Sequence, residues 1–144
     1  MATTKVLLVD DESRICQSVT YLLKAKNYEV VTAACGQDAL DLIANNTFDL
    51  AILDVHLPDM LGTQLMGYIK TQHPNTIFII ITGDADVESA IAALKCGAYD
   101  YLRKPFEFEE LLTTVENALH QKALKQEKDQ IQEQLVLTEE RYRY

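Results

Sequence analysis

The amino-acid sequence predicts an α/β domain, a doubly wound five-stranded parallel sheet with helices on both faces. Short apolar runs alternate strictly with stretches of helical periodicity over about the first 120 residues. Several of these runs are almost continuous Val, Ile and Leu, which is typical of strands covered on both faces. The chain has 144 residues and is 48% hydrophobic, so one domain of this size can bury a substantial core.

Five apolar runs are predicted to form the strands. The first, third and fourth are the most continuous, whereas the second and fifth are more mixed and could be edges. In chain order the runs are 5–9, 29–33, 50–54, 77–82 and 99–103.

Helical spacing of apolar residues fills the intervals between the runs. The first helix has Ser13 as a candidate N-cap, and the fourth is closed by Gly97. The apolar positions lie within 15–23, 39–43, 61–69, 87–94 and 111–119.

The segment 106–144 contains neither proline nor glycine, and one continuous helix through it would be roughly 58 Å long. We therefore expect a domain at 1–121 and a C-terminal helical extension at 122–144, a linker that leads to a missing output domain. A thin apolar seam has heptad spacing and slightly favours a dimeric coiled coil over a solvated helix, although Lys128 falls in a core position. The seam consists of Leu124, Ile131, Leu135, Thr138 and Tyr142.

Charge and composition argue against several classes of protein. The formal net charge is −9 and no stripe of Lys and Arg is visible, so direct binding of nucleic acid is not expected. No apolar run of about 18 residues is present, and the N-terminus does not resemble a signal peptide. We expect a cytoplasmic protein that is not inserted in a membrane. The three scattered cysteines suggest neither a disulfide framework nor a zinc site.

Polar residues follow four of the predicted strands. Asp10 and Asp11 come after the first and Asp54 ends the third, while Thr82 ends the fourth and Lys104 follows the fifth. The carboxyl ends of parallel strands lie at one edge of a sheet, so these side chains should converge there. Three close carboxylates repel one another unless a hard cation such as Mg²⁺ sits among them. A carboxylate beside Mg²⁺ and an ammonium group can accept a phosphoryl group.

These motifs resemble the receiver domain of bacterial two-component response regulators. The resemblance covers residues 4 to about 121 and implies a flavodoxin-like sheet with strand order 2-1-3-4-5. The motifs are VDDE at 9–12, DVHLPDMLG at 54–62, ITG at 81–83, KCGA at 95–98 and YLRKPF at 101–106.

By this resemblance, Asp54 would be the phosphoacceptor. Asp10 and Asp11 would hold Mg²⁺ together with Asp54 and the backbone carbonyl of His56. His56 and Asp84 would flank the path of the water that removes the phosphoryl group, and their types would tune the rate of dephosphorylation.

The same resemblance assigns roles to residues on the fourth and fifth strands. Thr82 would donate a hydrogen bond to a phosphoryl oxygen, and Lys104 would pair with the phosphoryl group or with the empty Asp54. Tyr101 would be an aromatic switch that turns inward on activation. The peptide bond before Pro105 would be cis and would aim Lys104.

The function implied is that of a phosphoacceptor phosphorylated by a sensor histidine kinase, and not of an enzyme in the usual sense. Phosphorylation would change the face formed by 87–94, 99–103 and 111–119, from which the long helix continues toward an output domain. A homodimer, which is also expected, would place two output domains side by side.

Two other functions use similar features. A small Mg²⁺-dependent phosphatase or hydrolase would also use an Asp nucleophile, but the haloacid-dehalogenase type needs an acid two residues after it, where His56 stands. A flavodoxin-like cofactor binder would need a phosphate-binding loop after the first strand, where the sequence is Asp10-Asp11-Glu12.

Overall fold

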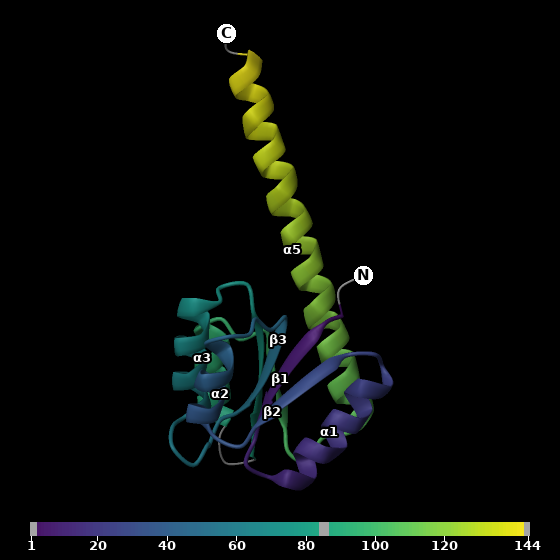
Figure 1. Ribbon diagram of the computed structural model, residues 1–144, viewed down its shortest axis with the longest axis vertical. Helices are drawn as coiled ribbons and strands as arrows, with labels where there is room; N and C mark the ends of the chain where they lie inside the picture. The colour runs from purple at the N-terminus through teal and green to yellow at the C-terminus, as the bar shows by residue number, and fades with distance from the viewer. Residues whose placement is uncertain (1–2, 84–86, 143–144) are drawn as a thin grey trace.

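The computed structural model describes the backbone of residues 3–83 and 87–142, and the side chains of 3–83 and 87–125. Its centre is a parallel sheet with strand order β2-β1-β3-β4-β5 (Figure 1), as the sequence and the resemblance predict. The strands are β1 (Lys5–Val9), β2 (Glu29–Ala33), β3 (Leu50–Asp54), β4 (Ile77–Thr82) and β5 (Asp100–Arg103).

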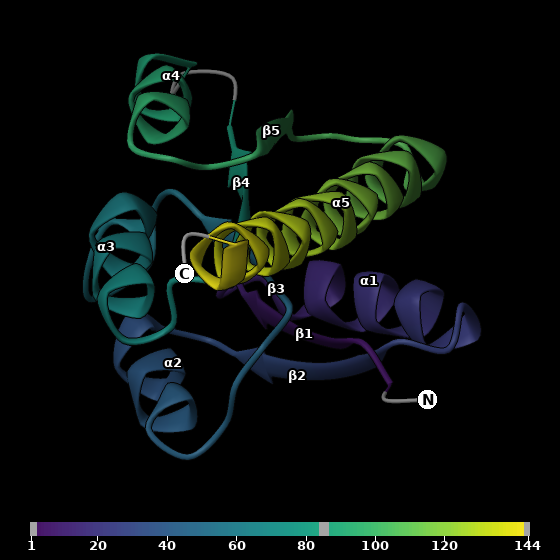
Figure 2. The same cartoon turned by 90° about the horizontal axis from the view of Figure 1, so that it is seen from above.

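Helices cover both faces of this sheet, as Figure 2 shows in a view from above. On one face lie α2 (Gly36–Ile43), α3 (Gly62–Gln72) and α4 (Val87–Lys95), and on the other lie α1 (Ser13–Ala25) and α5 (Phe108–Tyr142). Alternate residues of each strand therefore enter two separate cores. Leu7 and Leu53 pack with the first set of helices, and Leu8 and Ile52 with the second.

Burial on both faces explains why β1, β3 and β4 read as continuous apolar runs. The described residues of β3 are all buried, whereas the edge strand β2 contains exposed, partly buried and buried positions. The mixed second and fifth runs are the two edge strands.

Two predicted helix ends can be compared with the structure. Gly97 closes α4, because its φ of 114° lets the chain reverse while Ala98 N–H donates to the Ala93 carbonyl. The prediction of Ser13 as N-cap was wrong. Glu12 occupies the N-cap position and Ser13 is the first helical residue, because the Cys16 N–H already donates to the Glu12 carbonyl.

Helix α5 continues well past the sheet. Its 35 residues correspond to about 52 Å, and it leaves the domain at the end opposite the carboxyl edge of the sheet (Figure 1). Lys122 Nζ still contacts the domain, at 3.1 Å from Asp49 Oδ1. In the predicted seam, Leu124 is 52% exposed, and the side chains of its other members lie outside the described residues. None of the described helices has an apolar stretch long enough to cross a membrane.

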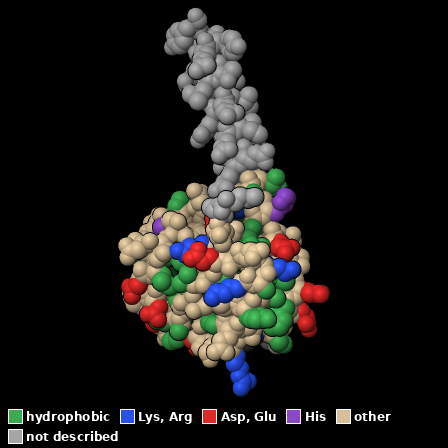
Figure 3. Space-filling view, turned by 45° about the vertical axis from the view of Figure 1, so that its right-hand side comes forward, with side chains coloured by type: hydrophobic (Ala, Val, Ile, Leu, Met, Phe, Trp, Pro, Cys, Tyr) green, Lys and Arg blue, Asp and Glu red, His purple; other side chains and the backbone are tan. Residues whose placement is uncertain are grey.

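Acidic and basic side chains are interspersed on the described part of the face shown in Figure 3, where no single basic patch gathers. This distribution is the ordinary one for a solvated surface.

Candidate phosphoacceptor site

The ends of the strands bring the predicted site residues to one edge of the sheet. The backbone ladder continues one residue past several strands: Asp10 N–H donates to the Ala33 carbonyl at 3.1 Å, and Lys104 N–H donates to the Thr82 carbonyl at 2.8 Å. Asp54 is the last residue of β3 and pairs with Ile81 of β4. These bonds place Asp10, Asp54, Thr82 and Lys104 on neighbouring strand ends.

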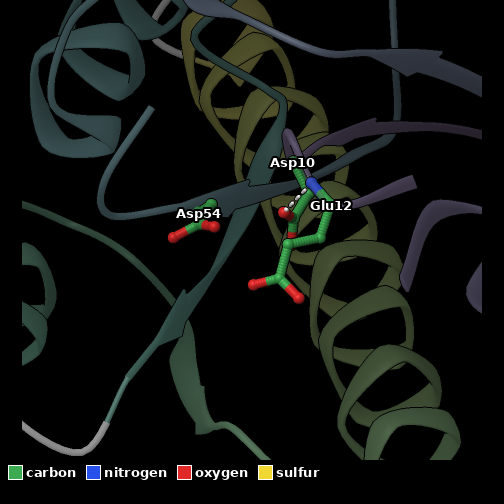
Figure 4. Close-up of side chains that lie close together, drawn as sticks. All are labelled: Asp10, Glu12 and Asp54. Atoms are coloured by element: carbon green, nitrogen blue, oxygen red, sulfur yellow. Dashed lines mark hydrogen bonds between the residues drawn. The ribbon is translucent and has the colours of Figure 1, made fainter. Parts of the chain in front are cut away.

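Three carboxylates meet at this edge, which we call the acidic cluster: Asp10, Glu12 and Asp54. One oxygen of each lies within 4.8 Å of the others (Figure 4). The turn after β1 explains why Glu12 takes part, because its N–H donates to Asp10 Oδ1 at 2.9 Å and the chain folds back over the site. Asp10 and Asp54 are buried, and Glu12 is exposed.

Lys104 lies at the centre of the acidic cluster. Its Nζ is 3.1 Å from Asp10 Oδ2, 2.9 Å from Glu12 Oε1 and 3.0 Å from Asp54 Oδ2. The peptide bond between Lys104 and Pro105 is cis, as predicted. One cation therefore faces three anions, and the site keeps a surplus of negative charge.

The pKa values follow from this arrangement. Burial raises the pKa of Asp10 to about 6, and the nearby Asp54 charge acts in the same direction, against the Glu12 N–H and the Lys104 charge. Burial lowers the pKa of Lys104, but hydrogen bonds to Glu12 and Asp54 outweigh it and leave that pKa above its usual value. Lys104 is therefore charged, and Asp10 is the carboxylate that most needs a further cation.

Close backbone packing fixes the Asp54 carboxylate. Oδ1 accepts the His56 N–H at 3.1 Å, while Oδ2 faces Lys104. Residue 62 must be small here, because a Cβ at Gly62 would collide with the Asp54 carbonyl oxygen. The first turn of α3 can thus approach the end of β3 closely.

The acidic cluster fits a hard divalent cation. Asp10 Oδ2 is buried and accepts no hydrogen bond of good geometry among the described residues, although it forms an ion pair with Lys104. An oxygen in that position is suited to binding a metal ion, and carboxylate oxygens are the ligands that Mg²⁺ prefers. The donor set therefore agrees with the predicted metal site at Asp10 and Asp54.

The acidic cluster and the predicted metal ligands differ at one position, and the role of Asp11 as a ligand stays a prediction. Asp11 is exposed and does not belong to the acidic cluster of the described residues, whereas Glu12 does. In the sequence, Glu12 stands out only as the last residue of the VDDE motif at 9–12. The backbone bond from Glu12 to Asp10 that brings it inward is a turn feature, and the three consecutive acids give no signal of it.

The remaining predicted residues also lie at or near this edge. Thr82 is fully buried and its hydroxyl donates to the Gly83 carbonyl at 3.1 Å. Tyr101 is half-buried and packs against the core beneath α3 and α4. His56 follows Asp54 in the β3–α3 loop, with an exposed side chain. Asp84 lies outside the described residues.

Comparisons with known proteins agree with this geometry. A family model described as response regulator receiver domain matches residues 6–116. The chain is 40% identical over 114 residues to the transcriptional regulatory protein ZraR of Salmonella typhimurium, covering 79% of this chain and 26% of that protein. It is 33% identical over 126 residues to the regulatory protein AtoC of Escherichia coli, covering 88% of this chain and 27% of that protein.

Solved structures give the same result. A CheY-like receiver domain protein from Methanospirillum hungatei has a TM-score of 0.82 at 33% identity, covering 86% of this chain and 99% of that one. NtrX from Brucella abortus has a TM-score of 0.85 at 33% identity, covering 90% of this chain and 30% of that one.

The chain spans about a quarter of the length of ZraR and AtoC. The hydrolase alternative is not favoured, since the matched family accepts phosphoryl groups and is not a classical enzyme family. The chain belongs to the response regulator receiver domain family, the phosphoryl-accepting signalling domains of two-component systems.

Proposed function

We propose that Asp54 is the phosphoacceptor of this receiver domain. The observation that carries the proposal is the position of its carboxylate. It lies at the carboxyl edge of the sheet with its side chain 10% exposed, and Oδ2 is 3.0 Å from Lys104 Nζ. A carboxylate held beside a cation at an accessible edge can attack phosphorus while the surrounding charges stabilise the transferring group.

The donor in this proposal is a phosphohistidine of a sensor histidine kinase. An Asp54 oxygen forms a bond to phosphorus while the phosphorus–nitrogen bond breaks, and its electron pair stays with the departing imidazole. Lys104 turns from the Asp54 oxygen to the incoming phosphoryl oxygens. Thr82 turns its hydroxyl from the Gly83 carbonyl to a phosphoryl oxygen.

Asp10 and Asp54 would hold Mg²⁺ through their carboxylates. The backbone carbonyl of His56 and the carboxylate of Asp11 are the further ligands expected from the family resemblance, and Glu12 is the third member of the acidic cluster. Bound Mg²⁺ would supply neutralisation of the charge on the phosphoryl oxygens.

Phosphorylation adds close to two negative charges and three acceptor oxygens to this edge. In our proposal, Thr82 moves toward the phosphoryl group and Tyr101 turns inward into the space beside it. The face of α4, β5 and α5 changes shape, and α5 carries the change away from the domain. A cytoplasmic homodimer with an output domain beyond α5 would use this route for its signal.

Chemical trapping tests the assignment. The protein is incubated with acetyl phosphate and Mg²⁺, reduced with borohydride and mapped by peptide mass spectrometry, which locates an acyl phosphate at the residue that carried it. We expect the reduced residue to be Asp54, and we expect no reduced residue when EDTA replaces Mg²⁺. Reduction at Asp10, Asp11 or Glu12 in place of Asp54 would refute the proposal.

A further inference from the structure

The loop between β3 and α3, residues 55–61, is hydrogen-bonded to the start of α2 through the side chain of Asp59. We propose that Asp59 is a positioning residue, which anchors this loop to α2 and so holds the His56 carbonyl where Mg²⁺ needs it. The inference rests on the proposed function, because it concerns a ligand of the same site.

Asp59 caps a helix that has no cap of its own. Its Oδ1 accepts the Gly36 N–H at 2.8 Å and its Oδ2 accepts the Gln37 N–H at 2.9 Å. The N-cap residue of α2 is Cys35, whose side chain makes no capping bond. A carboxylate at a helix N-terminus satisfies free N–H groups and meets the positive end of the helix dipole. Accordingly, the Gly36 and Gln37 N–H groups lower the pKa of Asp59.

Met60, the next residue after Asp59, packs against the same first turn of α2. The Met60 thioether occupies the volume that a side chain at residue 36 would need, so a Cβ at Gly36 would collide with it. Residues 59 and 60 thus contact the first turn of α2 through both a polar and an apolar contact. Helix α2 is itself fixed, since Ala39 and Ile43 are buried in the core.

Hydrogen bonds within the loop connect residues 59–61 to residues 55–57, so the two parts should move together. Leu57 N–H donates to the Met60 carbonyl at 3.2 Å, and His56 forms an antiparallel bridge with Leu61. At the base, the Gly62 N–H donates to the Val55 carbonyl at 2.7 Å. A loop closed by these bonds passes displacement of its tip to His56.

His56 is the point at which this displacement would reach the site. Its N–H donates to Asp54 Oδ1, so the His56 backbone is already coupled to the proposed phosphoacceptor. Residues that orient metal ligands typically change metal affinity about 10–100-fold when they are replaced. An anchor that acts through a loop should lie near the lower end of that range.

Two substitutions of Asp59 and one control separate the anchor from its charge. Asp59→Ala removes the anchor and the charge, whereas Asp59→Asn removes the charge and keeps an acceptor oxygen. Asp38→Ala is the control, because Asp38 is an acidic residue in the first turn of the same helix and belongs to α2 itself. Mg²⁺ affinity is measured by isothermal titration calorimetry, and amide hydrogen exchange over 55–61 is measured on the metal-free proteins.

We expect Asp59→Ala to raise the Kd for Mg²⁺ roughly tenfold and to speed exchange over 55–61. The Kd of Asp59→Asn for Mg²⁺ should stay within about threefold of the wild-type value, and the Kd of Asp38→Ala should equal the wild-type value. Phosphorylation of Asp59→Ala by acetyl phosphate should recover at saturating Mg²⁺.

A Kd for Asp59→Ala within twofold of the wild type would overturn the inference, and so would equal effects of the Ala and Asn variants, which would indicate charge alone. Failure of the wild type to bind Mg²⁺ or to be phosphorylated would instead refute the proposed function. The exchange rates of metal-free Asp59→Ala report on the anchor in either case, and unchanged rates would refute it.

Discussion

Replacement of Lys104 by methionine would remove the only positive charge that the described residues place inside the acidic cluster, and would keep most of the apolar stem. Lys104 Nζ lies within 3.1 Å of Asp10, Glu12 and Asp54. The Asp10 side chain is 0% exposed and that of Asp54 is 10% exposed, so water can do little to stabilise either charge once Lys104 is gone.

The size of the effect follows from burial. Removal of one partner of a buried ion pair costs roughly 3–5 kcal/mol, because the other charge is left uncompensated. Lys104 is 18% exposed, and Asp10, whose pKa is already raised to about 6 by burial, can take up a proton when the cation is lost. We therefore expect the free energy of unfolding of the metal-free protein to fall by about 2–4 kcal/mol near neutral pH.

Lys122→Met is the matched control, since the same substitution removes a lysine whose partner is accessible. Lys122 Nζ pairs with Asp49, whose side chain is 44% exposed, so this variant should lose less than about 1 kcal/mol. Urea unfolding followed by circular dichroism gives both values, in EDTA and in Mg²⁺. Mg²⁺ should restore much of the loss in Lys104→Met, because a bound cation compensates the same carboxylates.

A loss of stability in Lys104→Met no larger than that in Lys122→Met, both measured in EDTA, would contradict this role of Lys104. A smaller stabilisation by Mg²⁺ of Lys104→Met than of the wild type would also contradict it.

Four further predictions concern the metal, the stability of the metal-free protein, the metal ligands and the long helix. Mg²⁺ affinity, measured by calorimetry, should fall from about pH 7.5 to about pH 5.5, because Asp10 must lose its proton to bind the cation. The raised pKa of Asp10 should also make metal-free protein more stable in urea as the pH falls from about 6 toward 4, because the folded state then binds the proton more tightly than the unfolded chain. Mg²⁺ titration of Asp11→Ala and Glu12→Gln should show which of these two carboxylates binds the metal ion together with Asp10 and Asp54. The family resemblance predicts the larger loss of Mg²⁺ affinity for Asp11→Ala, whereas a larger loss for Glu12→Gln would favour the acidic cluster as the ligand set. Truncation after Lys122 should weaken self-association in sedimentation equilibrium and leave phosphorylation of Asp54 unchanged, and equal association of both forms would argue against the coiled-coil seam.

The sheet could be predicted because its buried strands appear in the sequence as continuous runs of apolar residues. Burial on both faces requires continuous apolar residues, so β1, β3 and β4 could be located to the residue. The start of β5 was predicted at Tyr99, one residue before the observed start at Asp100. The long helix followed from the lack of proline and glycine, whereas its seam lies mostly on side chains outside the described residues.

The site residues at the ends of strands could be predicted from the sequence, whereas the contacts made by loop residues could not. Asp10, Asp54 and Thr82 are fixed by the sheet, and their convergence follows from parallel strand direction. The inward position of Glu12 depends on a side-chain-to-backbone bond in a turn, and the anchoring of residue 59 depends on a helix distant in sequence. Such contacts have no periodic signature, so only the three-dimensional arrangement reveals them.

Asp54 is proposed to accept the phosphoryl group, and intact mass spectrometry after incubation with acetyl phosphate and Mg²⁺ is the direct test. We expect the wild type to gain the mass of one phosphoryl group and to lose it on mild alkaline treatment, as an acyl phosphate does. Asp54→Asn should keep the fold and gain nothing, because only the nucleophile is lost. An equal and persistent gain by a folded Asp54→Asn variant would show that another residue accepts the phosphoryl group.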